Sequence, residues 1–268
     1  YYLPLAVNTD RLNSQLNSQT REEKDRFSAD ISFVGSMYHK NSYDDIKDKL
    51  PPYLRGYFDA AMLAQLNIYG DNIIDELLTV DILKQLSEFV DFRQDKRAFS
   101  DIRLVFESTF LGFKLANIER VRTLNLLAKK NKVALYTDEQ DTSLINVDFK
   151  GTVDYMNDMP KVFNNSSINL NMTIRNIRTG IPLRVWDILG AGGFLLTNYQ
   201  IELTDYFKNE ESIVYYEDMY DCCKKAEYYL LHEDKRRQIA AKGHELVSKK
   251  HSYINRVKYI LDVIGKMS

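Results

Sequence analysis

The chain has 268 residues, with 36 lysines and arginines against 38 aspartates and glutamates and a formal net charge of −2. This balance argues against nucleic acid or an anionic membrane as a general partner, and no run of about 18 apolar residues is present to span a bilayer. The length suffices for a well-buried core in one large domain or two small ones.

The two cysteines, Cys222 and Cys223, are adjacent, a spacing that suits neither a disulfide nor a metal site. We therefore expect a reducing, cytoplasmic compartment. With only four histidines and no paired spacing among them, no metal site is expected. The sequence begins at Tyr1 rather than at a methionine, so we expect it to be part of a longer protein.

The first 28 residues differ in character from those that follow. The apolar octet YYLPLAVN (1–8) is interpreted as the tail of a preceding domain, and the polar run over 9–28 as a linker or exposed turn. The stretch DISFVGS (30–36) is short, apolar and closed by Gly35, which predicts a buried strand followed by a tight turn. Residues 29–268 are expected to form the main domain.

Residues 43–130 have almost no strand signal and predict helices. Apolar residues recur at helical spacing over 73–90, and 102–130 predicts one or two further helices. This is more helix than one crossover connection needs. We therefore predict a helical insertion over about 43–110, followed by the first crossover helix.

From residue 132 onward, strand-like and helical segments alternate. Strands are predicted over 132–138, 167–173, 193–198 and 212–217, with a short mixed segment over 146–153. Helices are predicted over 158–166, 182–190, 202–207, 219–232, 234–251 and 254–267. This alternation predicts an α/β fold with a Rossmann-like, doubly wound parallel sheet. Such sheets bind ligands at the carboxyl ends of their strands, often at a helix N-terminus.

The segment TGIPLRVWDILGAGG (179–193) holds the main candidate site. The loop before its helix carries Arg175 and Arg178, and Gly180 there would let the backbone approach a ligand closely. Pro182 suits the first helical turn. A helix N-terminus with two loop arginines is a good site for a phosphate or diphosphate.

Arg184 and Asp187 are three residues apart and so lie on one face of that helix. The remaining apolar positions, Ile181, Val185, Ile188 and Leu189, can face the sheet. On the residues alone, a core helix with a glycine cap and one exposed Arg–Asp pair explains the segment equally well.

Residues from about 151 to 255 resemble the C-terminal, donor-binding domain of GT-B glycosyltransferases. The closest likeness is to the "glycosyl transferases group 1" branch that includes spore-maturation-type proteins. It rests on Arg184-Val185-Trp186-Asp187 followed by ILGAGG, and on YYEDMYDCCKKAEYYLLHEDKRRQIAAKGHELVSKKHSYINRV with its terminal His-x-Tyr. YLPLAVN resembles the end of the family's N-terminal domain, and DISFVGSMYHKN the first strand and loop of its C-terminal domain.

The resemblance implies a bacterial, cytoplasmic glycosyltransferase that moves a sugar from a nucleotide-diphosphate sugar, UDP-sugar above all, to an unknown acceptor with retention. It further implies an N-terminal domain as partner and no other cofactor. Arg184 and Asp187 are the implied catalytic residues. The donor-binding residues predicted on this basis are Gly35, Ser36, Thr173, Arg175, Arg178, Thr179, Gly180, Ile181, Pro182, Arg184 and Asp187. For Gly35 and Ser36, an ordinary turn after the first strand is the alternative.

Many retaining members carry two glutamates separated by seven residues around a Gly-Leu-Pro turn. Setting Asp187 on the second glutamate places Thr179 on the first, so one acid is present in shortened form and the other is missing. The resemblance implies that Asp187 contacts the ribose, while a sugar contact at Thr179 stays open. A non-catalytic nucleotide-sugar-binding or structural module of the same fold is the alternative function, and the missing acid would be its sign.

Overall fold

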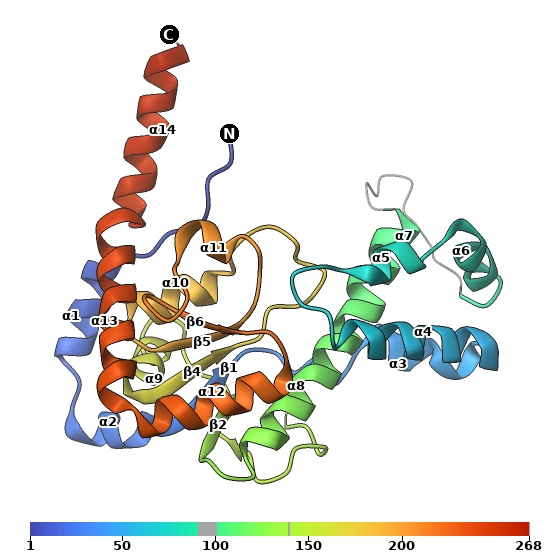
Figure 1. Cartoon of the computed structure of the whole chain (residues 1–268), viewed down its shortest axis with the longest axis horizontal. Coiled ribbons are helices and arrows are strands. Elements are labelled where there is room, and N and C mark those ends of the chain that lie inside the picture. Colours follow the sequence, from blue (N-terminus) through green and yellow to red (C-terminus); the bar gives the residue numbers. More distant parts are fainter. Residues whose placement is uncertain (91–100, 139, 268) are drawn as a thin grey trace.

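The computed structural model describes residues 1–90, 101–138 and 140–267. Its centre is a six-stranded sheet in which every neighbouring pair is parallel, in the order β3-β2-β1-β4-β5-β6 (Figure 1). The strands are β1 (Ala29–Val34), β2 (Val133–Tyr136), β3 (Asp148–Phe149), β4 (Ser166–Asn171), β5 (Leu195–Asn198) and β6 (Val214–Tyr216). The predicted doubly wound α/β fold is confirmed.

Helices cover both faces of the sheet because alternate strand residues point to opposite sides. Ile31 and Phe33 of β1 pack into one buried cluster and Val34 into another. The first cluster includes residues of α8 (Phe113–Leu127) and α12 (Met219–Leu231), and the second those of α9 (Met159–Asn165), α10 (Leu183–Gly190) and α11 (Leu203–Tyr206). Helix α13 (Glu233–Lys250) contributes buried residues to both.

Residues 9–28 form two helices, α1 (Thr9–Asn17) and α2 (Arg21–Phe27), so the predicted linker or exposed turn is wrong in its secondary structure. Thr20 and Glu23 cap α2 reciprocally, which favours a helix start within a polar sequence. Leu12 of α1 and Phe27 of α2 are buried in the core, and Leu16 of α1 packs against it. The polar residues of this run therefore cover a surface. A domain boundary at residue 28 stays a prediction.

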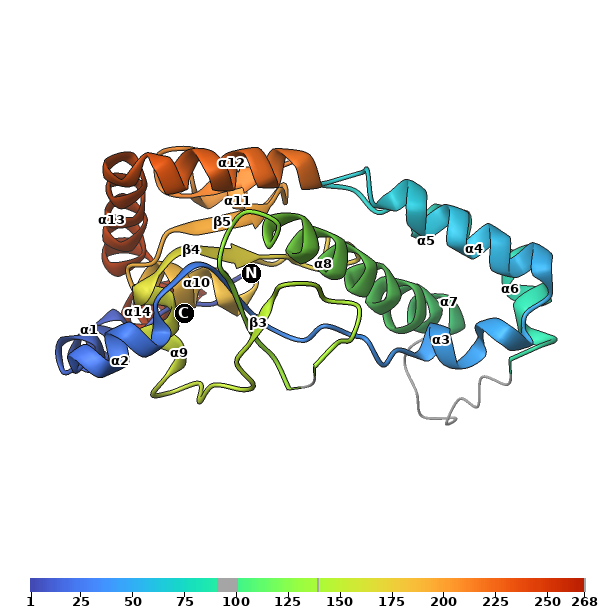
Figure 2. The ribbon, with the colours of Figure 1, turned by 90° about the horizontal axis from the view of Figure 1, so that it is seen from below.

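The predicted insertion forms a helical unit beside the sheet (Figure 2). It contains α3 (Ser42–Ile46), the 3₁₀ turn η1 (Lys47–Lys49), α4 (Pro52–Gln65), α5 (Ile73–Leu77), α6 (Val80–Ser87) and α7 (Ile102–Val105). Residues 91–100 of the prediction lie outside the described residues. The helix predicted over 73–90 is divided in two, because the Thr79 hydroxyl accepts a hydrogen bond from the Ile82 amide and starts α6.

This helical unit has a hydrophobic core of its own, which includes Tyr43, Phe58, Leu86 and Phe106. Helix α7 passes without a break through the π-helical stretch η2 (Phe106–Gly112) into α8. The prediction of helix over 102–130 is thus confirmed up to Leu127. One continuous helical run therefore extends from the unit to the sheet (Figure 2).

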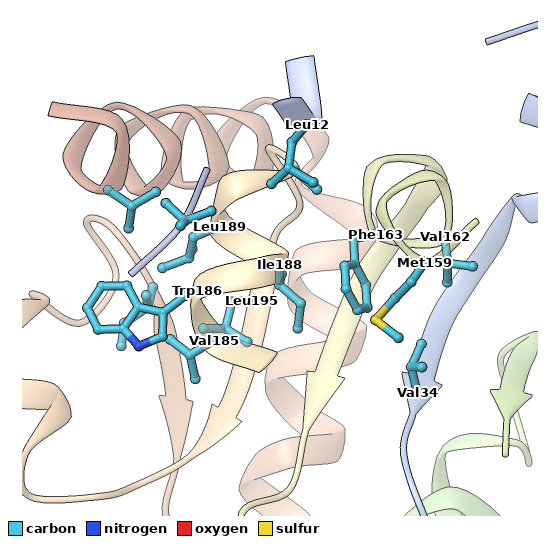
Figure 3. Packing of buried hydrophobic residues seen from close by; sticks show 14 of the residues in the cluster. Leu12, Val34, Met159, Val162, Phe163, Val185, Trp186, Ile188, Leu189 and Leu195 are labelled. Carbon is cyan, nitrogen blue, oxygen red and sulfur yellow. The ribbon is translucent and has the colours of Figure 1, made fainter. Parts of the chain in front are cut away.

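Helix α10 packs its predicted apolar face against the sheet. Val185, Ile188 and Leu189 are fully buried, and so is Trp186 (Figure 3). The glycines at the end of α10 allow the chain to turn toward β5, and they also leave room for neighbouring segments that pack closely against them. A Cβ atom at Gly190 would lie 2.2 Å from Val7 Cγ2, and one at Gly193 would lie 2.6 Å from the Phe163 carbonyl oxygen.

The last helix, α14 (Tyr253–Met267), projects from the body near the N-terminal segment (Figure 1). The Val7 amide donates to the His251 carbonyl at 3.1 Å, and the Tyr253 amide donates to the Val7 carbonyl at 3.3 Å. Arg256 donates to the carbonyl oxygens of Pro4 and Leu5. Backbone pairing and one arginine therefore join the two ends of the chain. No helix in the described ranges has the length and apolar character needed to cross a bilayer.

We predict that Gly193→Ala lowers the free energy of unfolding by about 1–3 kcal/mol, because the new methyl group meets backbone that has no free space. Urea denaturation measures the change. Gly56→Ala is the control, since nothing lies within 4 Å of its added Cβ in α4 and the helix should gain about 0.5–1 kcal/mol. Equal effects of the two substitutions would contradict the packing argument.

Acid should destabilise the fold through His251. Burial lowers its pKa from 6.5 to about 4, and the nearby Arg256 and Lys250 add to the shift. Between these pH values the unfolded chain binds a proton that the folded chain does not, so the free energy of unfolding falls as the pH falls. Thermal melts from pH 7 to pH 5 should show a smaller loss for His251→Gln than for the parent chain. Parallel curves would disprove this assignment.

Candidate functional site

A cavity of about 200 Å³ lies at the carboxyl ends of β1 and β4. At this point the chain order of the strands reverses, since β2 and β3 lie beyond β1 while β5 and β6 lie beyond β4. Loops leaving two such strands diverge to opposite faces of the sheet and leave a crevice between them. The lining comes from four segments: Phe33–Ser36 with Tyr38, Asn171–Ile174 with Ile177, Pro182 with Arg184, and Arg120 of α8.

Arg120 ties the two strand ends together at the base of this cavity. Its guanidinium donates to the Ser36 carbonyl after β1 and, at 2.6 Å, to the Met172 carbonyl after β4. It also lies 4.8 Å from the centre of the Tyr38 ring. Burial lowers the pKa of Arg120. A buried cation held by carbonyl oxygens leaves a positive field at the crevice.

Arg184 lies in the first turn of α10 and lines the same cavity. Its side chain contacts the Met159 sulfur and lies 5.4 Å from the centre of the Phe163 ring. Burial lowers the pKa of Arg184. In the described part of the chain no carboxylate lies within salt-bridge distance of it. Among the residues that the structure describes, the positive charge at this helix start therefore has no partner of opposite charge in direct contact.

Asp187 follows one turn along α10 and is outside the residues that line the cavity. Its carboxylate accepts a hydrogen bond from the Tyr155 hydroxyl at 3.1 Å. Burial raises its pKa, whereas Arg184 and the Tyr155 hydrogen bond act in the opposite direction. Arg184 and Asp187 lie on one helix face and are close enough for each charge to affect the pKa of the other group. Only Arg184 reaches the cavity.

Gly35, Ser36 and Thr173 all line the cavity, as a donor-binding role requires. A Cβ atom at Gly35 would lie 3.3 Å from the Phe33 ring. The Ser36 hydroxyl accepts a hydrogen bond from the Tyr38 amide at 3.2 Å. Thr173 is fixed by Asn198, which pairs with both its amide and its carbonyl oxygen.

Arg175 does not line this cavity, because its side chain turns toward the helical unit. It forms a buried salt bridge of 2.7 Å with Glu119, and the ring of Tyr69 lies 3.3 Å from its guanidinium carbon. Its Nε and Nη1 atoms are buried and have no hydrogen-bond partner in the described part of the chain. The arginine therefore fixes the loop to α8.

Arg178 and Thr179 also face the helical unit rather than the first cavity. Arg178 donates to Asp75 at 3.0 Å and to the Asn72 carbonyl at 3.2 Å. Both residues line a second cavity of about 530 Å³ beside α5, α7 and η2. The loop therefore contributes to both of these cavities, and Ile177 lines each of them. Arg175 and Arg178 also line a smaller cavity of about 20 Å³.

The turn before α10 shows why its residue types are needed. Gly180 has a φ of +95°, a conformation that favours glycine, and its amide donates to the Glu202 carboxylate. Ile181 is buried in the core and Pro182 is the N-cap of the helix, without a side-chain cap hydrogen bond. The Gly180 amide is thus used by the protein, whereas Pro182 lies at the cavity.

Sequence reasoning missed Arg120, the one lining cation that comes from α8. A signal was present, because Ala116, Arg120 and Leu124 recur at every fourth residue and share a helix face. All three are buried. A charged residue among apolar ones on the inward face of a crossover helix is therefore a candidate site residue.

No three His, Cys, Asp or Glu side chains within the described ranges are grouped to hold a metal, and the expected lack of a metal site remains a prediction.

Comparison with known proteins gave one family-model match and several similar solved structures. A family model described as "Glycosyl transferase-like" matches residues 118–262. A search of curated proteins found no match. Among solved structures, TarM of S. aureus is 13% identical with a TM-score of 0.44, over 53% of this chain and 31% of TarM.

Two further structures show the same level of likeness. HepE of Anabaena in complex with UDP-glucose is 11% identical with a TM-score of 0.46, over 55% of this chain and 44% of HepE. A glycosyltransferase of Rickettsia africae is 11% identical with a TM-score of 0.48, over 97% of this chain and 55% of that protein. The chain thus spans less than two thirds of each of these proteins.

The matched residues include α10, the second half of the sheet and most of α8. The predicted resemblance to glycosyltransferases is confirmed, while the spore-maturation branch stays a prediction. The family model matches just over half of the residues of this chain, so the chain belongs to the glycosyl transferase-like family.

Proposed function

We propose that this chain binds a nucleotide-diphosphate sugar and contributes to the transfer of its glycosyl group to an acceptor hydroxyl. The observation that carries the proposal is Arg184, a largely buried cation without a salt-bridge partner in the described ranges, beside a cavity at the point where strand order reverses. A buried charge in such a position favours an anionic ligand.

The diphosphate would lie against the start of α10. Pro182 provides no side-chain cap, and no acceptor in the described part of the chain takes the amides of Leu183 and Arg184. These amides, the helix dipole and the Arg184 guanidinium together suit two phosphate groups. Arg120 adds positive charge from the base of the cavity.

The same groups would act on the reaction. As the bond between the anomeric carbon and the phosphate oxygen breaks, negative charge accumulates on the diphosphate, and positive groups fixed around it stabilise that charge. The bond from the acceptor oxygen forms at the same carbon, and the acceptor proton passes to the leaving phosphate. This route needs no protein nucleophile, and we propose retention of configuration from the resemblance to retaining GT-B enzymes.

Finer features are also part of the proposal. We propose UDP as the nucleotide, a hexosyl group as the sugar and the ribose hydroxyls as the ligand of Asp187. An N-terminal domain would face the donor across the carboxyl edge of the sheet, in a bacterial, cytoplasmic protein. The alternative, a non-catalytic module, is favoured by Thr179, whose position carries a hydroxyl where many relatives have a carboxylate.

Calorimetry with UDP tests the binding site. We predict that the chain binds UDP and that Arg184→Gln weakens this binding at least tenfold, because one charge-assisted contact to phosphate is lost. Arg237→Gln is the control, since this exposed arginine pairs with Glu233 away from the cavity and should bind like the parent chain. Thermal melts check that each variant is folded. Absence of binding to UDP, GDP, TDP and their sugars would refute the proposal.

The ribose contact needs a separate comparison. Asp187→Asn should weaken UDP binding about tenfold and weaken 2′-deoxy-UDP binding less, because 2′-deoxy-UDP lacks the 2′-hydroxyl, one of the two from which the carboxylate would accept hydrogen bonds. An equal loss for both ligands would show that Asp187 acts through the fold. Equal loss of folding in Asp187→Ala and Arg184→Ala would favour a purely structural role for this helix.

A further inference from the structure

The second cavity is built between two parts of the chain that are far apart in sequence. The helical unit contributes Asp75 of α5, Arg103 of α7 and Glu107 of η2, and the loop after β4 contributes Asn176, Arg178 and Thr179. Its volume is about 530 Å³. Ile177 lines both cavities, so a ligand here would lie directly beside a nucleotide in the first cavity.

The lining of this cavity carries two arginines, Arg103 and Arg178, and three acidic residues, Asp75, Asp101 and Glu107. Asp75 forms salt bridges of 3.0 Å with both Arg103 and Arg178. An anionic ligand would meet three carboxylates, and a cationic ligand would have to compete with the two arginines for Asp75. The lining therefore suits a neutral ligand that can form many hydrogen bonds.

Glu107 supplies an acceptor that the protein does not fully use. The residue is 7% exposed, and its Oε1 atom accepts a hydrogen bond from the Asn72 side chain. No partner for Oε2 exists in the described part of the chain, and this atom is not fully buried. The π-helical stretch that contains Glu107 is of a kind often found at functional sites.

Two apolar side chains complete the surface. Leu104 is 53% exposed and Ile177 is 36% exposed, and both line the cavity. A sugar ring combines hydroxyl groups with apolar C–H faces, so it can use carboxylate, amide and apolar partners together.

We propose that this second cavity binds a pyranose ring, with Glu107 accepting hydrogen bonds from its hydroxyls. The inference rests on the proposed function in placing the nucleotide next to it. The ring could belong to the donor sugar or to a sugar acceptor, because the two must meet beside the diphosphate. Glu107 would then determine which sugar binds. The loop after β4 contributes no carboxylate to this cavity.

Titrations with the full chain separate the two sources. In the donor arm, UDP is compared with UDP-glucose, UDP-galactose and UDP-N-acetylglucosamine. In the acceptor arm, methyl α-glucoside and maltose are followed by saturation-transfer NMR on the UDP-saturated chain. Glu107→Gln should weaken one of these sugar interactions about tenfold while UDP alone binds as before, because only the sugar hydroxyls meet the carboxylate.

Thr179→Val provides a second variant at an exposed position, in case Glu107→Gln lowers stability. Glu76→Gln is the matched control, since Glu76 is exposed on α5 and does not line the cavity. Sugar binding that is unchanged in both cavity variants, or changed equally in the control, overturns the inference.

If UDP fails to bind, the proposed function fails by itself. Methyl α-glucoside and maltose then test by themselves whether the second cavity binds a sugar. Binding that depends on Glu107 supports the inference, and absence of such binding overturns it as well.

Discussion

The buried salt bridge between Glu119 and Arg175 is the interaction on which the rest of the site depends. It joins α8 to the loop after β4, and both side chains are almost fully buried. Removing one partner of such a pair leaves a buried charge without compensation, at a typical cost of about 3–5 kcal/mol. The loop that carries Arg178, Thr179 and Gly180 is therefore positioned from outside the sheet.

Glu119 and Arg120 are consecutive residues on α8 and contact different partners. Glu119 holds the loop through Arg175, while Arg120 holds the ends of β1 and β4 through carbonyl oxygens. A shift of α8 along its axis would move both contacts at once. Since α8 continues from η2, one helical run contributes residues to both the second cavity and the first.

Much of the fold could be predicted because its signals are local. Alternating apolar strands and amphipathic helices predict a parallel sheet, and Pro182 with the glycines after Leu189 correctly places α10. The polar segment 9–28 was harder to predict, because only a few apolar residues, Leu12 and Leu16 of α1 and Phe27 of α2, hold its two helices to the core. The predicted site residues Gly35, Ser36, Thr173, Pro182 and Arg184 do come together.

The sequence by itself determined the alternation of strands and helices after residue 132, the helix start that faces the crevice and the family, because these depend on neighbouring residues and on spacing. Only the tertiary structure decided what the arginines do. Arg175 pairs with an acid 56 residues earlier, and Arg178 with one 103 residues earlier, whereas Arg184 has no such partner in the described ranges. Three arginines within ten residues have different roles because the fold brings carboxylates to the two in the loop and leaves the one on α10 at the first cavity.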